Sequence, residues 1–410
     1  MDDETDVRAL LTGVEAPPSR VDLDTVLIDG DRRIRRRWVV TIAGSTAVVL
    51  IALVGVPAAI AAIGGPQSSR PFADSPSAGP SAAPDVASKG APPSPSTAPP
   101  TAPPAAAKIC AAHPLPLPAG ATGAKAQAVD PTGRYIGGQT TGKKPRAVLW
   151  TDGVPTFLPI SEDWVEISGI NEHGVAVGMA MDNAGKIEYV FRYANGKATK
   201  LKNVPGYSHA YPVPAINAAG DIVINAETKN SVEGADSIAM IWKAGTITAQ
   251  RLPTRITDNV YAITDDGTVV GGHYGSDGAE SAAAWSQSGH ETRLDRPAGT
   301  RTVAYAARGD WAAGGAWSTV EGSNAVGGTP LWNLRTGAVK LVPGGVANAI
   351  NASGLVLSEN SQLYQDGAPP RQLAAPASGY RNFASGVADT GLVVGSLDAN
   401  GASNPTTWSC

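Results

Sequence analysis

The 410-residue sequence has few of the residues from which most active sites are built. It contains two cysteines and five histidines, and the histidines are spread singly along the chain. Because transition-metal sites need clustered His, Cys or carboxylate ligands, we predict no metal and no cofactor. The sequence also lacks a Gly-x-Ser-x-Gly nucleophile elbow and a Gly-x-x-x-x-Gly-Lys-Ser/Thr phosphate loop. It therefore carries no common sequence signature of an enzyme.

Basic residues form no block after the N-terminal region, and the net charge is −4. Nucleic-acid-binding domains carry a basic patch or stripe, so this composition argues against nucleic acid as a partner.

Charged residues are absent from residues 38–63. At a rise of 1.5 Å per residue, this stretch is long enough to cross a hydrocarbon core of about 30 Å. Five arginines lie just before it, between Arg32 and Arg37. The positive-inside bias predicts a single-pass cell-membrane protein, with residues 1–37 in the cytoplasm and the rest outside. A cleaved signal peptide is the alternative, although the apolar regions of such peptides are usually shorter.

Residues 64–108 are dominated by Pro, Ala and Ser. Such a segment lacks the apolar surface needed for a packed core, and we predict a disordered, semi-extended stalk. The expected domains are therefore a cytoplasmic tail (1–37), a membrane anchor (38–63), a linker (64–108) and an extracellular domain (109–410).

A short phrase recurs seven times between Asp130 and Gly391: an apolar run, a polar turn that ends in Gly, and a second apolar run. The turn glycines are Gly133, Gly174, Gly220, Gly267, Gly309, Gly354 and Gly391, spaced 37 to 47 residues apart. A period in the forties with strand-turn-strand content is typical of β-propeller blades. We predict an all-β, seven-bladed β-propeller. Six or eight blades are alternatives, because the unit around Gly309 is weak.

Each unit holds two further strand-like runs, which together predict a four-stranded antiparallel meander. The third run is usually centred on a large ring, such as Trp150, Trp242 or Trp332. We expect these rings to pack between neighbouring blades, because each buries a large apolar area.

The seventh unit reaches Cys410 with only three strand-like runs, whereas a fourth-strand signature, Leu-Pro, precedes the first unit in residues 110–118. We expect this N-terminal strand to complete the last blade and close the ring. Cys110 and Cys410 bracket the domain on the oxidising side of the membrane, which predicts a disulfide bond between them. Two free thiols, or a bond to another chain, are the alternatives.

The alternation of Ile-Asn-x-x-Gly with an Ala/Val-aromatic-Trp-x-x-Gly phrase resembles the extracellular HAF-repeat proteins. The segments Arg146–Gly153 and Ala239–Gly245 carry the resemblance most clearly, and it spans residues 120–408. No unit retains the His-Ala-Phe triplet itself. The charged N-terminus, single span and Pro/Ala stalk look like surface proteins of high-GC Gram-positive bacteria. The resemblance implies a displayed or secreted propeller-like repeat domain and no established reaction.

Aromatic residues gather in the segments that lead into the first strand of each unit, which in a propeller share one face around the mouth of the channel. The candidate ligand-binding residues are Trp164, Tyr207, His209, Tyr211, Tyr261, Tyr305, Tyr380 and Phe383. Aromatic platforms beside polar loops suit sugar or peptide recognition. The alternative is that these rings cover the blade tops and pack against one another.

Two functions follow from this sequence. The leading hypothesis is a membrane-tethered, non-catalytic binding or protein-interaction module for a cell-wall glycan, peptide or protein. The rival is an extracytoplasmic lyase or hydrolase that uses acids at the channel mouth, for example Glu166 and Asp258. Paired carboxylates meet only in three dimensions and leave no motif.

Overall fold

The computed structural model describes residues 108–410 except 185–187, 232–233, 276–277 and 320–327. In these residues the chain forms β-strands joined by turns and bends, with no helix. Accordingly, the described part contains no helix with the length and hydropathy of a membrane span. The predicted tail (1–37), span (38–63) and nearly all of the predicted linker (64–108) lie outside the described residues.

Most of the strands form five four-stranded antiparallel sheets, which we name A to E. Sheet A is β2 (Ala124–Val129), β3 (Tyr135–Thr140), β4 (Ala147–Thr151) and β5 (Val154–Phe157). Sheet B is β6 (Trp164–Ile170), β7 (Ala176–Met181), β8 (Glu188–Ala194) and β9 (Lys197–Lys200). Sheet C is β10 (Tyr207–Ile216), β11 (Ile222–Thr228), β12 (Ile238–Trp242) and β13 (Gln250–Arg251). Sheet D is β14 (Asn259–Ile263), β15 (Val269–Gly275), β16 (Gly278–Trp285) and β17 (Glu291–Arg293). Sheet E is β18 (Thr300–Arg308), β19 (Trp311–Ser318), β20 (Thr329–Asn333) and β21 (Val339–Val342).

The remaining strands form one eight-stranded sheet with the order β22-β23-β24-β25-β1-β28-β27-β26. Half-sheet F is β22 (Ala347–Ile350), β23 (Val356–Ser358), β24 (Gln362–Tyr364) and β25 (Arg371–Leu373). Half-sheet G is β26 (Arg381–Val387), β27 (Val393–Ala399), β28 (Ala402–Ser409) and β1 (Lys108–Pro114).

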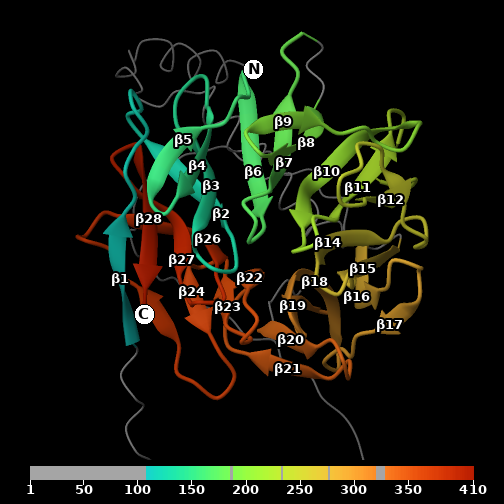
Figure 1. Cartoon of the computed structure of the whole chain (residues 1–410). Helices are drawn as coiled ribbons and strands as arrows, with labels where there is room; N and C mark the ends of the chain where they lie inside the picture. The colour runs from blue at the N-terminus through green and yellow to red at the C-terminus, as the bar shows by residue number, and fades with distance from the viewer. Residues whose placement is uncertain (1–107, 185–187, 232–233, 276–277, 320–327) are drawn as a thin grey trace, which may run out of the picture. The chain divides into compact units, whose positions relative to one another are not determined.

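The sheets follow one another around a ring (Figure 1). The first strand of each sheet lies against the first strand of the next, and β26 of G lies against β2 of A. The first strands are therefore innermost, and the last strand of each meander lies at the rim. This arrangement is the predicted all-β, propeller-like fold.

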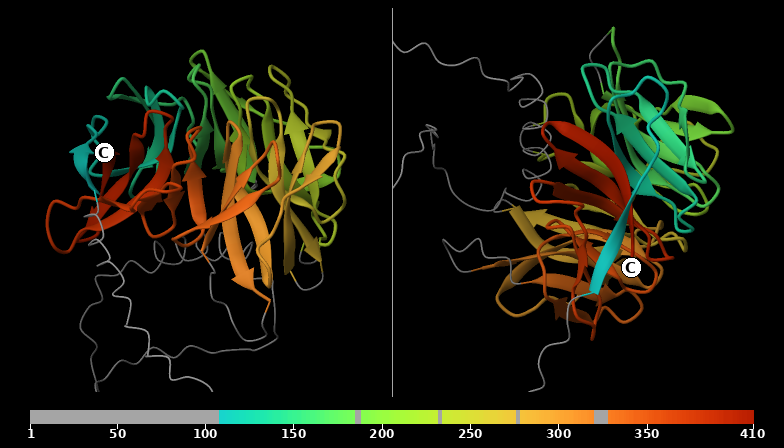
Figure 2. Two further views of the ribbon diagram at one scale, coloured as in Figure 1. Left: turned by 90° about the horizontal axis from the view of Figure 1, so that it is seen from below. Right: turned by 90° about the vertical axis from the view of Figure 1, so that its left-hand side faces the viewer.

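Strand β1 joins the two ends of the described chain. Residues 108–110 run parallel to residues 371–373 of β25, and residues 111–114 run antiparallel to residues 406–409 of β28. Figure 2 shows β1 beside the C-terminal strands. The predicted pairing of the N-terminal strand with the last unit is confirmed. The additional pairing with β25 links F to G and was not expected.

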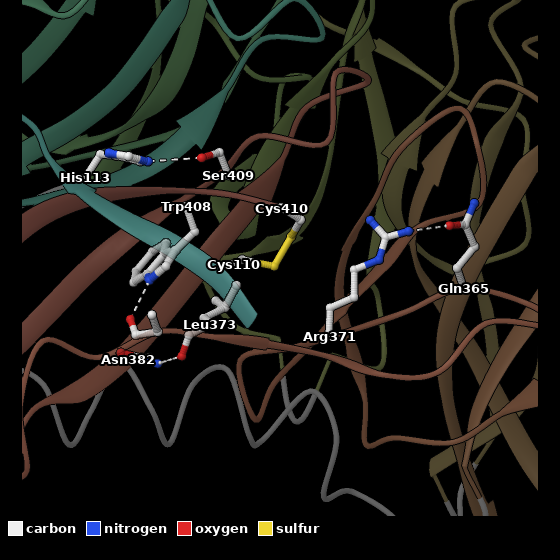
Figure 3. The surroundings of a disulfide bond; sticks show 10 residues. Cys110, His113, Gln365, Arg371, Leu373, Asn382, Trp408, Ser409 and Cys410 are labelled. Atoms are coloured by element: carbon white, nitrogen blue, oxygen red, sulfur yellow. Dashed lines mark hydrogen bonds between the residues drawn. A yellow bond between two sulfur atoms is a disulfide. The ribbon is translucent and has the colours of Figure 1, made fainter. Parts of the chain in front are cut away.

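Cys110 and Cys410 form the predicted disulfide bond (Figure 3). Cys110 is fully buried, in a cluster with Leu373 and Trp408. The bond links residues separated by 300 positions. For a loop of that length the chain-entropy model gives an upper figure of about 5–6 kcal/mol of stabilisation.

One register position in every third strand holds an aromatic residue. The seven residues are Trp150, Tyr193, Trp242, Trp285, Trp332, Tyr364 and Trp408. The five tryptophans are at most 2% exposed. Four of them donate the indole N–H to a backbone carbonyl just past the outer strand of the preceding sheet: Trp150 to Pro116 (2.8 Å), Trp242 to Lys202 (2.9 Å), Trp332 to Asp295 (2.6 Å) and Trp408 to Ala374 (2.9 Å). The expectation that these rings pack between neighbouring units is confirmed.

All seven first strands carry a β-bulge near the middle of their pairing with the second strand. In five second strands a glycine faces the residue before the bulge: Gly138, Gly178, Gly271, Gly314 and Gly395. A Cβ there would lie 1.7–2.1 Å from a carbonyl oxygen of the first strand. These glycines bring the two backbones together at the bulge, which bends the strand and re-aims its side chains.

Two adjacent glycines in β15 test this requirement. A Cβ on Gly271 would lie 1.8 Å from the carbonyl oxygen of Asn259, whereas the nearest atom to a Cβ on Gly272 is 3.3 Å away. We expect Gly271→Ala to lower the free energy of unfolding by about 3 kcal/mol or more, because backbone must move, and Gly272→Ala to cost about 1 kcal/mol. Chemical denaturation of both variants measures this difference. Equal losses would show that the bulge does not depend on Gly271.

Removal of the disulfide tests the closure of the ring. We expect Cys110→Ser/Cys410→Ser to lower the free energy of unfolding by about 2–5 kcal/mol, because the unfolded chain regains its loop entropy. Thermal unfolding of the oxidised protein and of the double variant measures the loss. A peptide digest without reductant must contain the Cys110–Cys410 crosslink, and its absence would contradict the assignment.

Candidate functional site

The ring has two chemically different ends. At the turn end, the repeated Gly turns connect each first strand to its second strand, and Gly133, Gly174 and Gly220 have φ of +80°, +72° and +89°. At the loop end, each outer strand connects to the next first strand. Lys108 pairs with Arg371, the first residue of β25, so the chain enters the described domain at the turn end.

Side chains tie neighbouring sheets together at the turn end. Asn171 donates its amide to the carbonyl of Asn217 (3.2 Å), and Asn217 donates in turn to the carbonyl of Thr264 (3.2 Å). Asn351 makes the equivalent bond to Ala388 (3.1 Å). The Asn of the repeated phrase is thus a link between turns. Its Oδ1 also accepts the backbone N–H two residues on, at Asn171 and Asn351, which is the local bond of an Asx turn.

Arg308 replaces this Asn in sheet E and makes a different link. Its guanidinium lies 2.7 Å from Asp265 of sheet D and 3.0 Å from Asp389 of half-sheet G. Because F separates E from G, the side chain reaches across the turn end of the ring. The motif around Gly309 is weak in sequence because Arg308 pairs with Trp311 across a two-residue turn, which is shorter than the turn between Asn171 and Val175 in sheet B.

Two cavities open at the turn end, between sheets C and D and between sheets B and C. The first, about 460 Å³, is lined by polar groups that include Asp221, Lys243 and Gln287. Lys243 lies 2.5 Å from Asp221 and also bonds Gln287. The second cavity, about 290 Å³, has a wall of Ala, Gly and Val with Arg192 and His173 at its rim. The polar groups of the first cavity bond one another, so its wall is a structural network.

Aromatic side chains follow the first strand of sheet C at the loop end. Tyr207, His209 and Tyr211 alternate along β10, and all three are half-buried. The rings of His209 and Tyr211 are stacked, with centroids 6.3 Å apart. The hydroxyl of Tyr211 donates to Ser237 (2.6 Å). Burial raises the pKa of Tyr211 to about 12.

Three further tyrosines continue this path through sheets D and E. Tyr261 and Tyr305 are bulge residues of β14 and β18, and their rings meet edge to face at 4.9 Å. The hydroxyl of Tyr274 in β15 lies 2.8 Å from that of Tyr261. Trp317 of β19 packs against Tyr305 at 6.2 Å. Burial holds the pKa of Tyr261, Tyr274 and Tyr305 well above the usual tyrosine value.

We call Tyr207, His209, Tyr211, Tyr261, Tyr274, Tyr305 and Trp317 the aromatic path. Five of them are among the eight sequence candidates. Trp164 packs against the same hydrophobic cluster as Tyr207. Tyr380 and Phe383 lie at the start of β26 in half-sheet G, away from sheets C to E. Sequence reasoning missed Tyr274 and Trp317, because both lie at the loop ends of second strands. In a propeller, each second strand ends at the face where the first strand begins. Applying this rule to the sequence would have identified both residues.

The acids named for lyase or hydrolase chemistry occupy separate structural positions. Glu166 is 6% exposed and accepts a hydrogen bond from Gln127 (3.4 Å). Asp258 is 2% exposed and contacts His273 at 2.7 Å. Each acid is buried with a different partner, and neither contact places the two carboxylates across a common space.

No family model matches this chain, and no curated protein matches it. Several solved structures are similar. One is an oligogalacturonate lyase from Vibrio parahaemolyticus (TM-score 0.47, 8% identity, 69% of this chain and 88% of that one). Others are the β-propeller domain of the Trilobed protease from Pyrococcus furiosus (TM-score 0.49, 12% identity, 70% and 94%) and YCF48 from Cyanidioschyzon merolae (TM-score 0.43, 14% identity, 74% and 99%). Likeness at this level says nothing about activity.

The bridge made by Arg308 generates a stability prediction. Arg308→Gln leaves Asp265 and Asp389 without their common cation, and we expect a loss of about 1–3 kcal/mol in the free energy of unfolding. The matched control in the same sheet is Arg335→Gln, which breaks an exposed pair with Asp310 and should cost about 0.5 kcal/mol or less. Denaturant titration of both variants measures the two losses in the free energy of unfolding. If Arg308→Gln lowers the free energy of unfolding no more than the control does, the ion pairs of Arg308 with Asp265 and Asp389 do not stabilise the turn end.

Proposed function

We propose that this protein is a membrane-tethered, cell-surface β-propeller of seven blades that binds a cell-wall ligand, without catalysis, on the aromatic path at its loop end. The seven blades are sheets A to E and half-sheets F and G. The tether is the predicted span at residues 38–63 and the Pro/Ala/Ser-rich stalk that follows it. The arginine cluster, the span and the resemblance to HAF-repeat proteins support display on a bacterial cell surface.

The aromatic path carries the proposal. It spans three successive sheets, and its tyrosines are half-buried rather than fully enclosed. A ring that is partly exposed at one face offers apolar area to a ligand at a low cost in side-chain entropy. The path lies at the opposite end of the ring from Lys108, where the chain enters the domain.

The electrostatics of the path favour a neutral, hydroxyl-rich ligand. The tyrosine hydroxyls are protonated at physiological pH, as tyrosine normally is, and burial raises their pKa values further. Carboxylates lie beside them: Glu227 is 3.9 Å from His209, and the charge of Glu359 acts on Tyr305. A polyanion would meet these carboxylates, whereas a sugar ring can stack its C–H face on tyrosine and donate its hydroxyls to the carboxylates. We therefore propose a wall glycan as the ligand class, ahead of a peptide or protein.

Thermal unfolding of the full-length chain in detergent tests this function. The probes are neutral wall-derived oligosaccharides, muropeptides and short peptides. A ligand at about 100 times its Kd adds roughly 2.7 kcal/mol of stability, so a binder raises the unfolding midpoint measurably. We expect the neutral oligosaccharides to give the largest shift. No shift with any oligosaccharide would reject the glycan proposal, and a shift with peptides alone would reassign the ligand class.

Variants on β10 locate the site. We expect Tyr207→Ala and His209→Ala each to weaken binding about tenfold, the effect of losing one aromatic contact of about 1.4 kcal/mol. The matched control is Ile247→Ala, an exposed apolar residue at the turn end that is 45% exposed. Isothermal titration of the three variants with the best oligosaccharide measures the change. Unchanged affinity in both β10 variants would place the ligand elsewhere.

A further inference from the structure

A buried histidine in sheet D bridges two carboxylates, one in the loop before β14 and one in β17. Nδ1 of His273 in β15 lies 2.7 Å from Asp258, which precedes β14, and Nε2 lies 3.0 Å from Glu291 in β17. The His273 side chain is 10% exposed and Asp258 is 2% exposed. The edge of the imidazole also meets the ring of Trp285 at 5.5 Å. Asp258, His273 and Glu291 form a polar row across sheet D.

The geometry of this row depends on the protonation state of His273. An imidazolium donates from both ring nitrogens and satisfies both carboxylates, whereas a neutral imidazole has one N–H and one lone pair. In the neutral state one carboxylate must therefore face that lone pair. The charged groups around the imidazole are Asp258 from the β13–β14 loop, Glu291 from β17, and Arg255, whose guanidinium lies 3.4 Å from Glu291. Trp285, from β16, is uncharged.

Residues 254–258 belong to the β13–β14 loop, which joins Arg251 to Asn259, and they need to be held in place. Thr257 has φ of +77°, a left-handed conformation that a β-branched residue rarely adopts. Asp258 fixes the loop by accepting the backbone N–H of Arg255 at 3.0 Å. Release of Asp258 or Glu291 would therefore let the loop leave a strained conformation.

The same loop contacts the aromatic path. The hydroxyl of Thr257 donates to the carbonyl of Tyr274 (3.0 Å), and its backbone N–H donates to the carbonyl of Ser237 (3.0 Å). Ser237 accepts the hydrogen bond from Tyr211. A change in the protonation of His273 can therefore alter the contacts of Tyr211 and Tyr274 through Thr257.

We propose that the row Asp258–His273–Glu291 is a pH-sensitive latch, which holds the β13–β14 loop against sheet D when His273 is protonated and releases it when His273 is neutral. The two carboxylates raise the pKa of His273 above 6.5, Asp258 contributing most and burial opposing them. A group with a raised folded pKa stabilises the folded state fully below its unfolded value, and this contribution is lost as pH rises through the folded pKa. The loop is therefore held at acidic pH and loosened at alkaline pH. If the path binds a ligand as proposed, affinity falls over the same range.

Hydrogen exchange of the full-length chain without any ligand tests the latch. We expect the amide protection factors of residues 254–258, corrected for intrinsic exchange, to fall about threefold or more between pH 6 and pH 9 relative to other loops. In Glu291→Gln the side-chain amide can donate or accept, so neutral His273 keeps both partners and the response should disappear. His273→Gln should also abolish it, which covers the case in which Glu291→Gln does not fold.

The matched control is His290→Gln, which removes an exposed histidine of the same sheet and should leave the response unchanged. Equal wild-type protection at the two pH values would overturn the latch, as would a response that persists in both Glu291→Gln and His273→Gln. Because no ligand enters this experiment, its failure would leave the binding proposal intact. Failure of the oligosaccharide titration would equally leave the latch intact.

Discussion

The contact between each third-strand ring and the outer edge of the preceding sheet is the interaction on which the ring depends. A four-stranded sheet with two apolar faces cannot stand alone, and the buried ring fills the space between two such faces. In four units the indole N–H also bonds one carbonyl of the preceding sheet's outer edge, which fixes how far one sheet slides along the next. Trp408 makes this contact from half-sheet G to F, and Trp150 makes it from A to the segment after β1. The joint between the two chain ends therefore uses the same interaction as the internal ones.

The inner strands are under a different constraint, because their backbones must bend around the axis of the ring. The bulges provide the bend, and Gly178 or Gly314 allows the second strand to follow it closely. A bulge also turns one side chain per sheet out of the alternating pattern. Tyr261 and Tyr305 occupy such positions, which is why they meet each other instead of packing inside separate sheets. The aromatic path thus results from the same backbone feature that shapes the ring.

Much of this fold could be predicted from the sequence, because its information is local and repeated. The Gly turns and the aromatic third strands recur at a similar spacing along the chain. Against this repeat, the absence of a fourth strand in the seventh unit can be recognised. The disulfide between Cys110 and Cys410 followed from the presence of only two cysteines at the ends of the repeats. What could not be predicted lies between units: the parallel pairing of β1 with β25, the reach of Arg308 past half-sheet F, and the meeting of Tyr274 with Tyr261. Such contacts depend on which ends of strands meet in space, and no single unit contains that information.

The position of the disulfide also determines how the domain would carry mechanical load. Cys110 is the third residue of β1, so tension applied through the preceding chain first shears the three-residue pairing with β25. It then passes through the sulfur atoms to Cys410 and into β28, the neighbouring strand. The hydrogen bonds of residues 111–114 are bypassed, and β1 cannot be peeled from the ring one pair at a time. When the domain is pulled from that end, the covalent bond, and not the outermost strand, bears the load.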